Sequence, residues 1–139
     1  MLSERCLTFM ERLAKQPGAS EEQLLRLQSD LGIELPADYL DALRFSNGAE
    51  GDLGGTEFWL QLWPACEVLT AIEGYRIRET APGLVPIATD GGGTLFGIDA
   101  RSRDPQRMDY VQFDPVNLGW GQEEFRCTTF TDFLEHIAT

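Results

Sequence analysis

The sequence contains few lysine, histidine and cysteine residues, which supply many of the nucleophiles, acid–base groups and metal ligands of proteins. Its 139 residues include one lysine, one histidine and three cysteines. We expect the lone histidine, His136, to have a surface or helix-end role rather than to act as a general base. No run approaches the roughly 18 apolar residues of a membrane span, and charged residues stand near Met1, where a signal peptide would be apolar. These absences predict a cytoplasmic protein that neither crosses a membrane nor is secreted.

The cysteines do not form a recognisable pattern. Cys6, Cys66 and Cys127 are odd in number, widely spaced and without a Cys-x-x-Cys pair. This argues against both a disulfide framework and a zinc site. Because each lies among apolar neighbours, we expect three buried free thiols.

Positive charge is also scarce, since 11 basic residues face 23 acidic ones and the net charge is -12. Residues 49–100 hold 2 basic and 8 acidic side chains, so their net charge of -6 is half of the total. Such a chain repels nucleic acids and anionic membranes. It is suited to a basic protein partner, although acidity also favours solubility by itself.

What the chain has is enough apolar material for a core, with 42% hydrophobic and 10% aromatic residues. We predict one domain spanning residues 1–139, with 1–18 as an N-terminal helical extension. Apolar spacing predicts a first helix from Leu2 through Leu13. A second begins after Ser20 in a capping box and ends at Gly32, and a third runs from Pro36 to Asn47-Gly48.

The remainder alternates between strands and turns. A glycine loop over 51–55 precedes a strand over 56–63, and Pro64 begins a helix through Tyr75. Three further strands are predicted over 84–89, 94–99 and 108–113, and a fourth over 124–128; Thr129 then caps a closing helix. The sequence therefore predicts an α+β fold, with N-terminal helices, a mainly antiparallel twisted sheet of hairpin-linked strands and a C-terminal helix.

Aromatic residues among carboxylates indicate a protein-binding surface, because apolar anchors with a charged rim are typical of interfaces. Trp59 and Trp63 share one strand face, where helices would bury them if that face belongs to the core. The candidate interface residues are Glu50, Asp52, Glu57, Trp59, Asp90 and Trp120.

Two other kinds of site are weaker alternatives. The Asp-Gly-Gly-Gly run at 90–93 is a hairpin turn rather than a phosphate loop, because a strand follows it and no Gly-Lys-Ser/Thr is present. Asp90, Asp99 and Asp114 offer oxygen ligands for a divalent metal, but aspartates beside glycine and proline are typical of turns. No catalytic residue, cofactor site or metal site is predicted.

Several segments in order resemble the Smi1/Knr4 family, also called the SUKH superfamily. The resemblance runs from about residue 20 to the end of the chain. It rests on Leu31-Gly32-Ile33 with Leu35-Pro36-Ala37-Asp38-Tyr39, Leu43 and Asn47-Gly48; on Leu62-Trp63; on Val85 through Gly93 with Phe96-Gly97-Ile98-Asp99; and on Phe130-Thr131-Asp132-Phe133-Leu134.

The resemblance implies an α+β domain without known catalysis. Many bacterial members are cytoplasmic immunity proteins that neutralise toxins, often nucleases, whereas fungal members are regulatory scaffolds. The implied function is binding of a cognate toxin, which we expect to be basic. The alternatives are a regulatory scaffold or a small metal- or ligand-binding enzyme that uses Asp90, Asp99 and Asp114. The motif residues themselves are implied to determine the fold and do not define a binding site.

Overall fold

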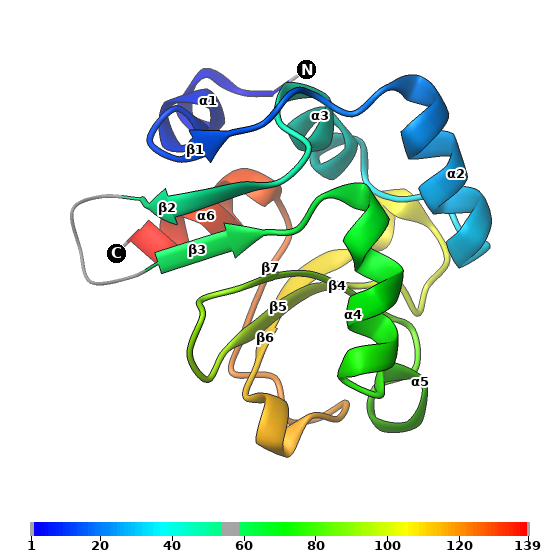
Figure 1. The fold of residues 1–139 in the computed structure, drawn as a ribbon. Helices are drawn as coiled ribbons and strands as arrows, with labels where there is room; N and C mark the ends of the chain where they lie inside the picture. The colour runs from blue at the N-terminus through cyan, green and yellow to red at the C-terminus, as the bar shows by residue number, and fades with distance from the viewer. Residues whose placement is uncertain (1, 54–58, 139) are drawn as a thin grey trace.

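A computed structural model describes residues 2–53 and 59–138 (Figure 1). It confirms the α+β class, with helices near both ends of the described chain and one antiparallel sheet. The helices are α1 (Glu4–Met10), α2 (Glu21–Leu31), α3 (Ala37–Phe45), α4 (Val68–Gly74), α5 (Ile77–Thr80) and α6 (Phe130–Ala138). The short 3-10 helices are η1 (Ala65–Glu67), η2 (Pro105–Arg107) and η3 (Pro115–Asn117).

The sheet has seven described strands, and their order in space is their order in the sequence. Every neighbouring pair is antiparallel. The strands are β1 (Ala14–Lys15), β2 (Ala49–Asp52), β3 (Trp59–Leu62), β4 (Leu84–Thr89), β5 (Leu95–Asp99), β6 (Asp109–Phe113) and β7 (Phe125–Cys127).

The second helix begins and ends with the capping interactions that the sequence predicts. The Ser20 hydroxyl accepts a hydrogen bond from the Gln23 backbone N–H, and the Gln23 side chain accepts one from the backbone of Ser20. Gly32 ends the helix in the left-handed region at φ 72°. The closing helix is also capped as predicted, because the Thr129 hydroxyl accepts a 3.0 Å hydrogen bond from the Asp132 N–H.

Other predicted boundaries are wrong in part. The first helix ends at Met10 rather than at Leu13, because the chain turns there into β1. Pro36 is the residue before the third helix rather than its first residue. Gly51 belongs to β2 and not to a loop, since pairing with Leu60 of β3 extends the strand through the glycine.

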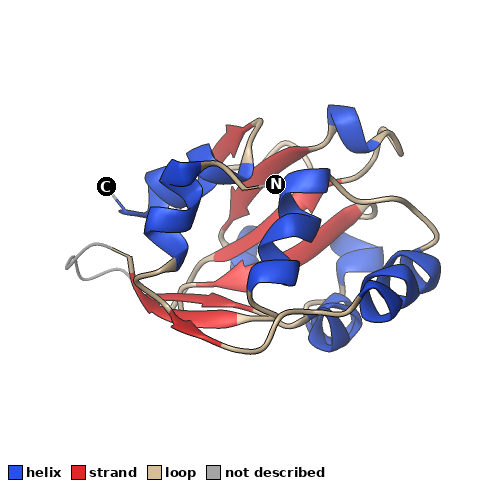
Figure 2. Cartoon of the chain, turned by 90° about the horizontal axis from the view of Figure 1, so that it is seen from above, coloured by secondary structure: helices blue, strands red, loops and turns tan. Residues whose placement is uncertain are grey.

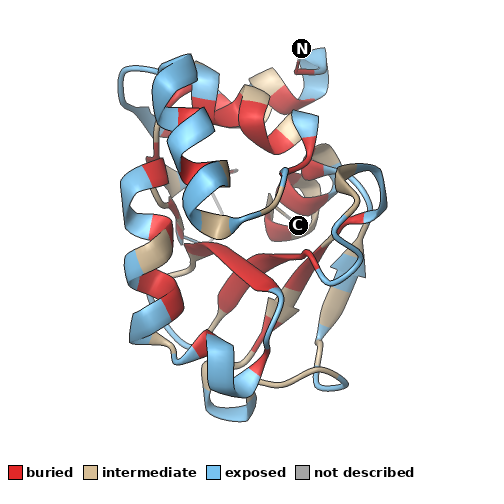
Figure 3. Ribbon diagram, turned by 90° about the vertical axis from the view of Figure 1, so that its right-hand side faces the viewer, coloured by how far each residue is buried: buried red, intermediate tan, exposed pale blue. Residues whose placement is uncertain are grey.

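Helices lie on both faces of the sheet, as Figures 1 and 2 show together. On one face α6 packs against the central strands, where Phe133 meets Phe96 edge to face at a centroid distance of 5.3 Å. On the other face α4 packs against β4. The buried residues follow the central strands and the inner sides of the helices (Figure 3). No helix in the described ranges is long and apolar enough to span a membrane.

The cysteines differ in exposure. All three are free thiols, but only Cys6 is buried, whereas Cys127 is half-buried and Cys66 is exposed. The prediction of three buried thiols is therefore wrong for Cys66 and only partly correct for Cys127. Cys66 lies in η1, where the residue before it, Ala65, is the buried one.

Candidate functional site

Among the described residues, no helix passes in front of β2 and β3 in the view of Figure 1. In the antiparallel register Asp52 is opposite Trp59, and Glu50 is opposite Gln61. Residues directly opposite each other project from the same face of a sheet. Glu50, Asp52 and Trp59 are exposed and Gln61 is half-exposed, so these four side chains share one accessible face. We call them the acidic–aromatic face.

Trp59 is the apolar centre of this face. Its side chain is 49% exposed, whereas Leu60 and Leu62, on the opposite side of the same strand, are buried. Trp63 lies on the same side as Trp59 but is half-buried and packs on Tyr75 at a ring-centroid distance of 6.1 Å. The end of α4 therefore covers Trp63 and leaves Trp59 accessible.

The β4–β5 hairpin flanks Trp59. A Cβ atom placed on Gly91 would lie 3.8 Å from Cδ1 of the indole. In the same turn Asp90 Oδ1 accepts hydrogen bonds from the backbone N–H groups of Gly92 and Thr94, at 2.9 and 3.2 Å. These bonds confirm the predicted hairpin, and they fix the acidic side chain next to the tryptophan-bearing strand.

Of the two remaining candidate interface residues, Glu57 lies outside the described residues, and Trp120 lies outside this face. Trp120 is half-buried in the turn after β6, where its indole N–H donates to the Pro82 carbonyl at 2.8 Å. Its ring meets Phe113 edge to face, and the Arg101 guanidinium stacks 3.7 Å from the ring centroid.

A second polar cluster surrounds Asp99, which is 8% exposed. Arg101 donates to both carboxylate oxygens at 3.0 and 2.9 Å, and Arg126 donates to Oδ2 at 2.9 Å. Burial by itself would raise the pKa of Asp99, but the hydrogen bonds from the two arginines outweigh it and lower that pKa. Arg126 also pairs with Asp109 and Glu123, so Asp99 belongs to a wider network of ion pairs.

The three aspartates considered as metal ligands are not brought together. Asp90 precedes β5 and Asp99 ends it, so the two lie at opposite ends of one strand. Asp114 accepts a 2.9 Å hydrogen bond from the Val116 N–H and forms a turn of its own. Among the described residues, no three His, Cys, Asp or Glu side chains are grouped to hold a metal ion.

His136 lies against β6 and β7. Its ring stacks on Phe125 at a centroid distance of 3.5 Å, and its Nε2 atom lies 2.7 Å from the amide oxygen of Gln112. Burial lowers the pKa of His136 below its ordinary value of 6.5. The role at the helix end is therefore one of packing, which the sequence alone did not specify.

The fold and the exposed face define a small α+β domain that presents carboxylates around an accessible tryptophan. A model of the SMI1 / KNR4 family (SUKH-1) matches residues 18–136, and the chain belongs to this family. The match leaves α1 and β1 on its N-terminal side. A search of curated proteins gave no significant match.

Proposed function

We propose that the protein is a non-enzymatic immunity protein of the bacterial cytoplasm, which neutralises a cognate basic toxin by binding it. The observation that carries the proposal is Trp59, which is half-exposed opposite Asp52 on a sheet face that no described helix covers. Family membership supports a binding role for such a domain, and the net charge of -12 supports a basic partner.

Charged and aromatic side chains have different roles in a protein interface. Carboxylates attract a basic partner over distance and raise its association rate. A large aromatic side chain then supplies buried apolar area at the centre, where hot spots are found. A nuclease toxin suits this surface, since its substrate-binding face must be basic to attract nucleic acid. An acidic protein on that face would exclude the substrate.

The direct experiment mixes the protein with the toxin-domain product of the adjacent gene and measures affinity by calorimetry at several salt concentrations. We expect binding that weakens as salt rises. Trp59→Ala is expected to cost at least about 2 kcal/mol of binding free energy, as hot-spot residues do. Leu25→Ala is the matched control, because Leu25 is 66% exposed on α2 and lies outside the acidic–aromatic face.

Two results would contradict the proposal. One is the absence of binding to the products of both neighbouring genes. The other is a complex whose affinity is unchanged by Trp59→Ala, which would place the interface elsewhere. A regulatory scaffold is the second candidate, since the family match supports it equally. It predicts a gene neighbourhood without a toxin and a partner that has no toxic activity.

A further inference from the structure

A groove of about 230 Å³ opens between the C-terminal end of α2, helices α4 and α5, and the chain that flanks β4 and β5. Its floor includes the buried apolar residues Ile72, Ile77, Leu84 and Val85, and polar groups form the larger part of its accessible lining. This groove is not part of the acidic–aromatic face, because it is lined by none of the residues of β2 or β3.

The rim of the groove is basic, which is unusual in a chain of this charge. Of the 11 basic side chains, eight form ion pairs within the described structure. The other three are Arg12, Arg78 and Arg103, and two of these, Arg78 and Arg103, line the groove. Arg12 does not line the groove, and its guanidinium donates a hydrogen bond to the Leu53 carbonyl at 2.6 Å.

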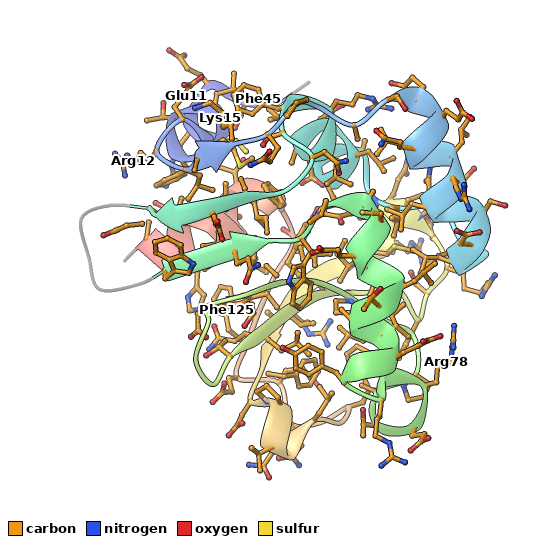
Figure 4. The ribbon with its side chains drawn as sticks, viewed as in Figure 1. Glu11, Arg12, Lys15, Phe45, Arg78 and Phe125 are labelled. Carbon is orange, nitrogen blue, oxygen red and sulfur yellow. The ribbon has the colours of Figure 1, made fainter. Side chains whose placement is uncertain are left out.

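The two rim arginines retain hydrogen-bonding capacity. Arg78 is exposed on α5 and extends at the edge of the molecule below α2 (Figure 4). Arg103 donates one N–H to the Gly32 carbonyl at 2.8 Å, which anchors its guanidinium beside the end of α2. A guanidinium carries five N–H donors, and Arg103 uses one of them within the described part of the chain. The one acid at the rim, Asp30, pairs with Arg26 at 3.9 Å.

We propose that this groove binds an aliphatic carboxylate, with the carboxylate at Arg78 and Arg103 and the aliphatic chain on the apolar floor. Guanidinium groups match carboxylates in geometry and charge. The volume lies below the roughly 300 Å³ at which sites for drug-sized ligands begin, so the ligand is short. The small volume favours a free short-chain acid, and a peptide C-terminus, which presents the same carboxylate, is the alternative that the test distinguishes.

The test is a titration of the ¹⁵N-labelled full chain, followed by the backbone amide signals of Ile77, Leu84 and Ala100. Hexanoate is expected to shift these signals with a dissociation constant on the order of 1 mM, as suits a ligand of its size. Hexanol, of equal chain length and without charge, is expected to bind at least tenfold more weakly. Equal binding of the two, or no shift at tens of millimolar hexanoate, would overturn the proposal.

A second pair of ligands identifies the source of the carboxylate. Acetyl-Gly-Leu is compared with its C-terminal amide, and tighter binding of this peptide acid than of hexanoate would overturn the assignment to a free acid in favour of a peptide C-terminus. Tighter binding of hexanoate assigns it to a free acid. A peptide acid and peptide amide that bind equally well would contradict carboxylate recognition.

Substitutions distinguish a loss of hexanoate binding from a loss of protein stability. Arg78→Gln removes an exposed charge that has no ion-pair partner among the described residues, so the melting temperature is expected to be unchanged while hexanoate binds roughly tenfold more weakly. Arg103→Gln is expected to weaken binding similarly and also to lose its bond to α2. Arg107→Gln is the control, because Arg107 is exposed and pairs with Asp104 outside the groove. Wild-type affinity in Arg78→Gln would refute the assignment.

Discussion

The phenol of Tyr110 donates a 2.5 Å hydrogen bond to Oδ1 of Asp38, joining β6 to the first turn of α3. The second carboxylate oxygen of Asp38 accepts the backbone N–H of Phe130 at 2.8 Å, where α6 begins. One side chain thus connects three elements that are remote in sequence. Asp38 lies within the Leu35-Pro36-Ala37-Asp38-Tyr39 segment by which the sequence resembles its family.

Tyr39 and Tyr110 both pack on Phe130, and their substitution by phenylalanine is expected to have different effects. Tyr110→Phe removes a donor to a carboxylate, and we expect it to lower the free energy of unfolding by about 1.5–3 kcal/mol. Tyr39→Phe is the matched control. The Tyr39 hydroxyl is buried and has no hydrogen-bond partner among the described residues, so its removal is expected to be neutral or stabilising. Urea denaturation measures both changes, and equal losses would contradict the assigned roles.

The parts of the fold that were predictable depend on interactions within a few residues. The capping box at Ser20, the left-handed Gly32 and the glycine turn at 90–93 each connect neighbours along the chain, and each is present in the structure. The closing helix is similarly marked by Thr129. Such signals need no knowledge of the rest of the chain, which is why they could be read directly.

The rest depended on contacts between distant segments. β2 contains Gly51, which has little intrinsic strand preference, and only its pairing with β3 makes it a strand. Trp59 and Trp63 carry the same local pattern, yet α4 covers only one of them. The ion pair between Asp99 and Arg126 spans 27 residues. No spacing in the sequence indicates these relations, so the sequence could propose interface residues but not separate accessible from packed ones.

Loss of the Asp99 carboxylate is expected to destabilise the fold. Asp99→Asn leaves Arg101 and Arg126 without their shared anion, and breaking a buried pair costs several kcal/mol. Both arginines are partly exposed, at 48% and 34%, so water compensates in part and we expect about 1–3 kcal/mol. Asp114→Asn is the control, because an asparagine oxygen can still accept the Val116 N–H. Chemical denaturation near neutral pH compares the two variants.

The contribution of Asp99 also depends on pH. Its pKa is lower in the folded protein than in the unfolded chain, where an aspartate titrates near 3.9. The stabilisation is therefore complete above the unfolded pKa and is lost as the pH falls through the folded pKa. We expect the difference in unfolding free energy between wild type and Asp99→Asn to shrink on acidification below about pH 4. A difference that stays constant over this range would contradict the ion-pair origin of the effect.

The pKa of the lone histidine, His136, can be measured directly by NMR. Because burial lowers the pKa of His136, its proton NMR signals are expected to titrate below the ordinary value near 6.5. The unfolded chain then binds the proton more readily than the folded protein. Stability is expected to be full above pH 6.5 and to decline as the pH falls from there through the folded pKa. His136→Gln should remove this part of the pH dependence, and a titration above the ordinary value would contradict a buried ring.

The two glycines Gly97 and Gly74 offer a sharp contrast in packing. A Cβ atom on Gly97, in the central strand β5, would lie 2.6 Å from Leu84 Cδ1 and 2.8 Å from the Val85 backbone oxygen. The backbone atom cannot move without disturbing the β4–β5 pairing, so Gly97→Ala is expected to cost roughly 1–3 kcal/mol by overpacking.

Gly74 ends α4, and a Cβ atom added there would meet no other atom within 4 Å. Gly74→Ala should stabilise the protein by about 0.4–1 kcal/mol through the entropy of the unfolded chain. Thermal and urea denaturation measure both variants, and a neutral Gly97→Ala would mean that β4 and β5 are less closely packed at this position than the structure shows.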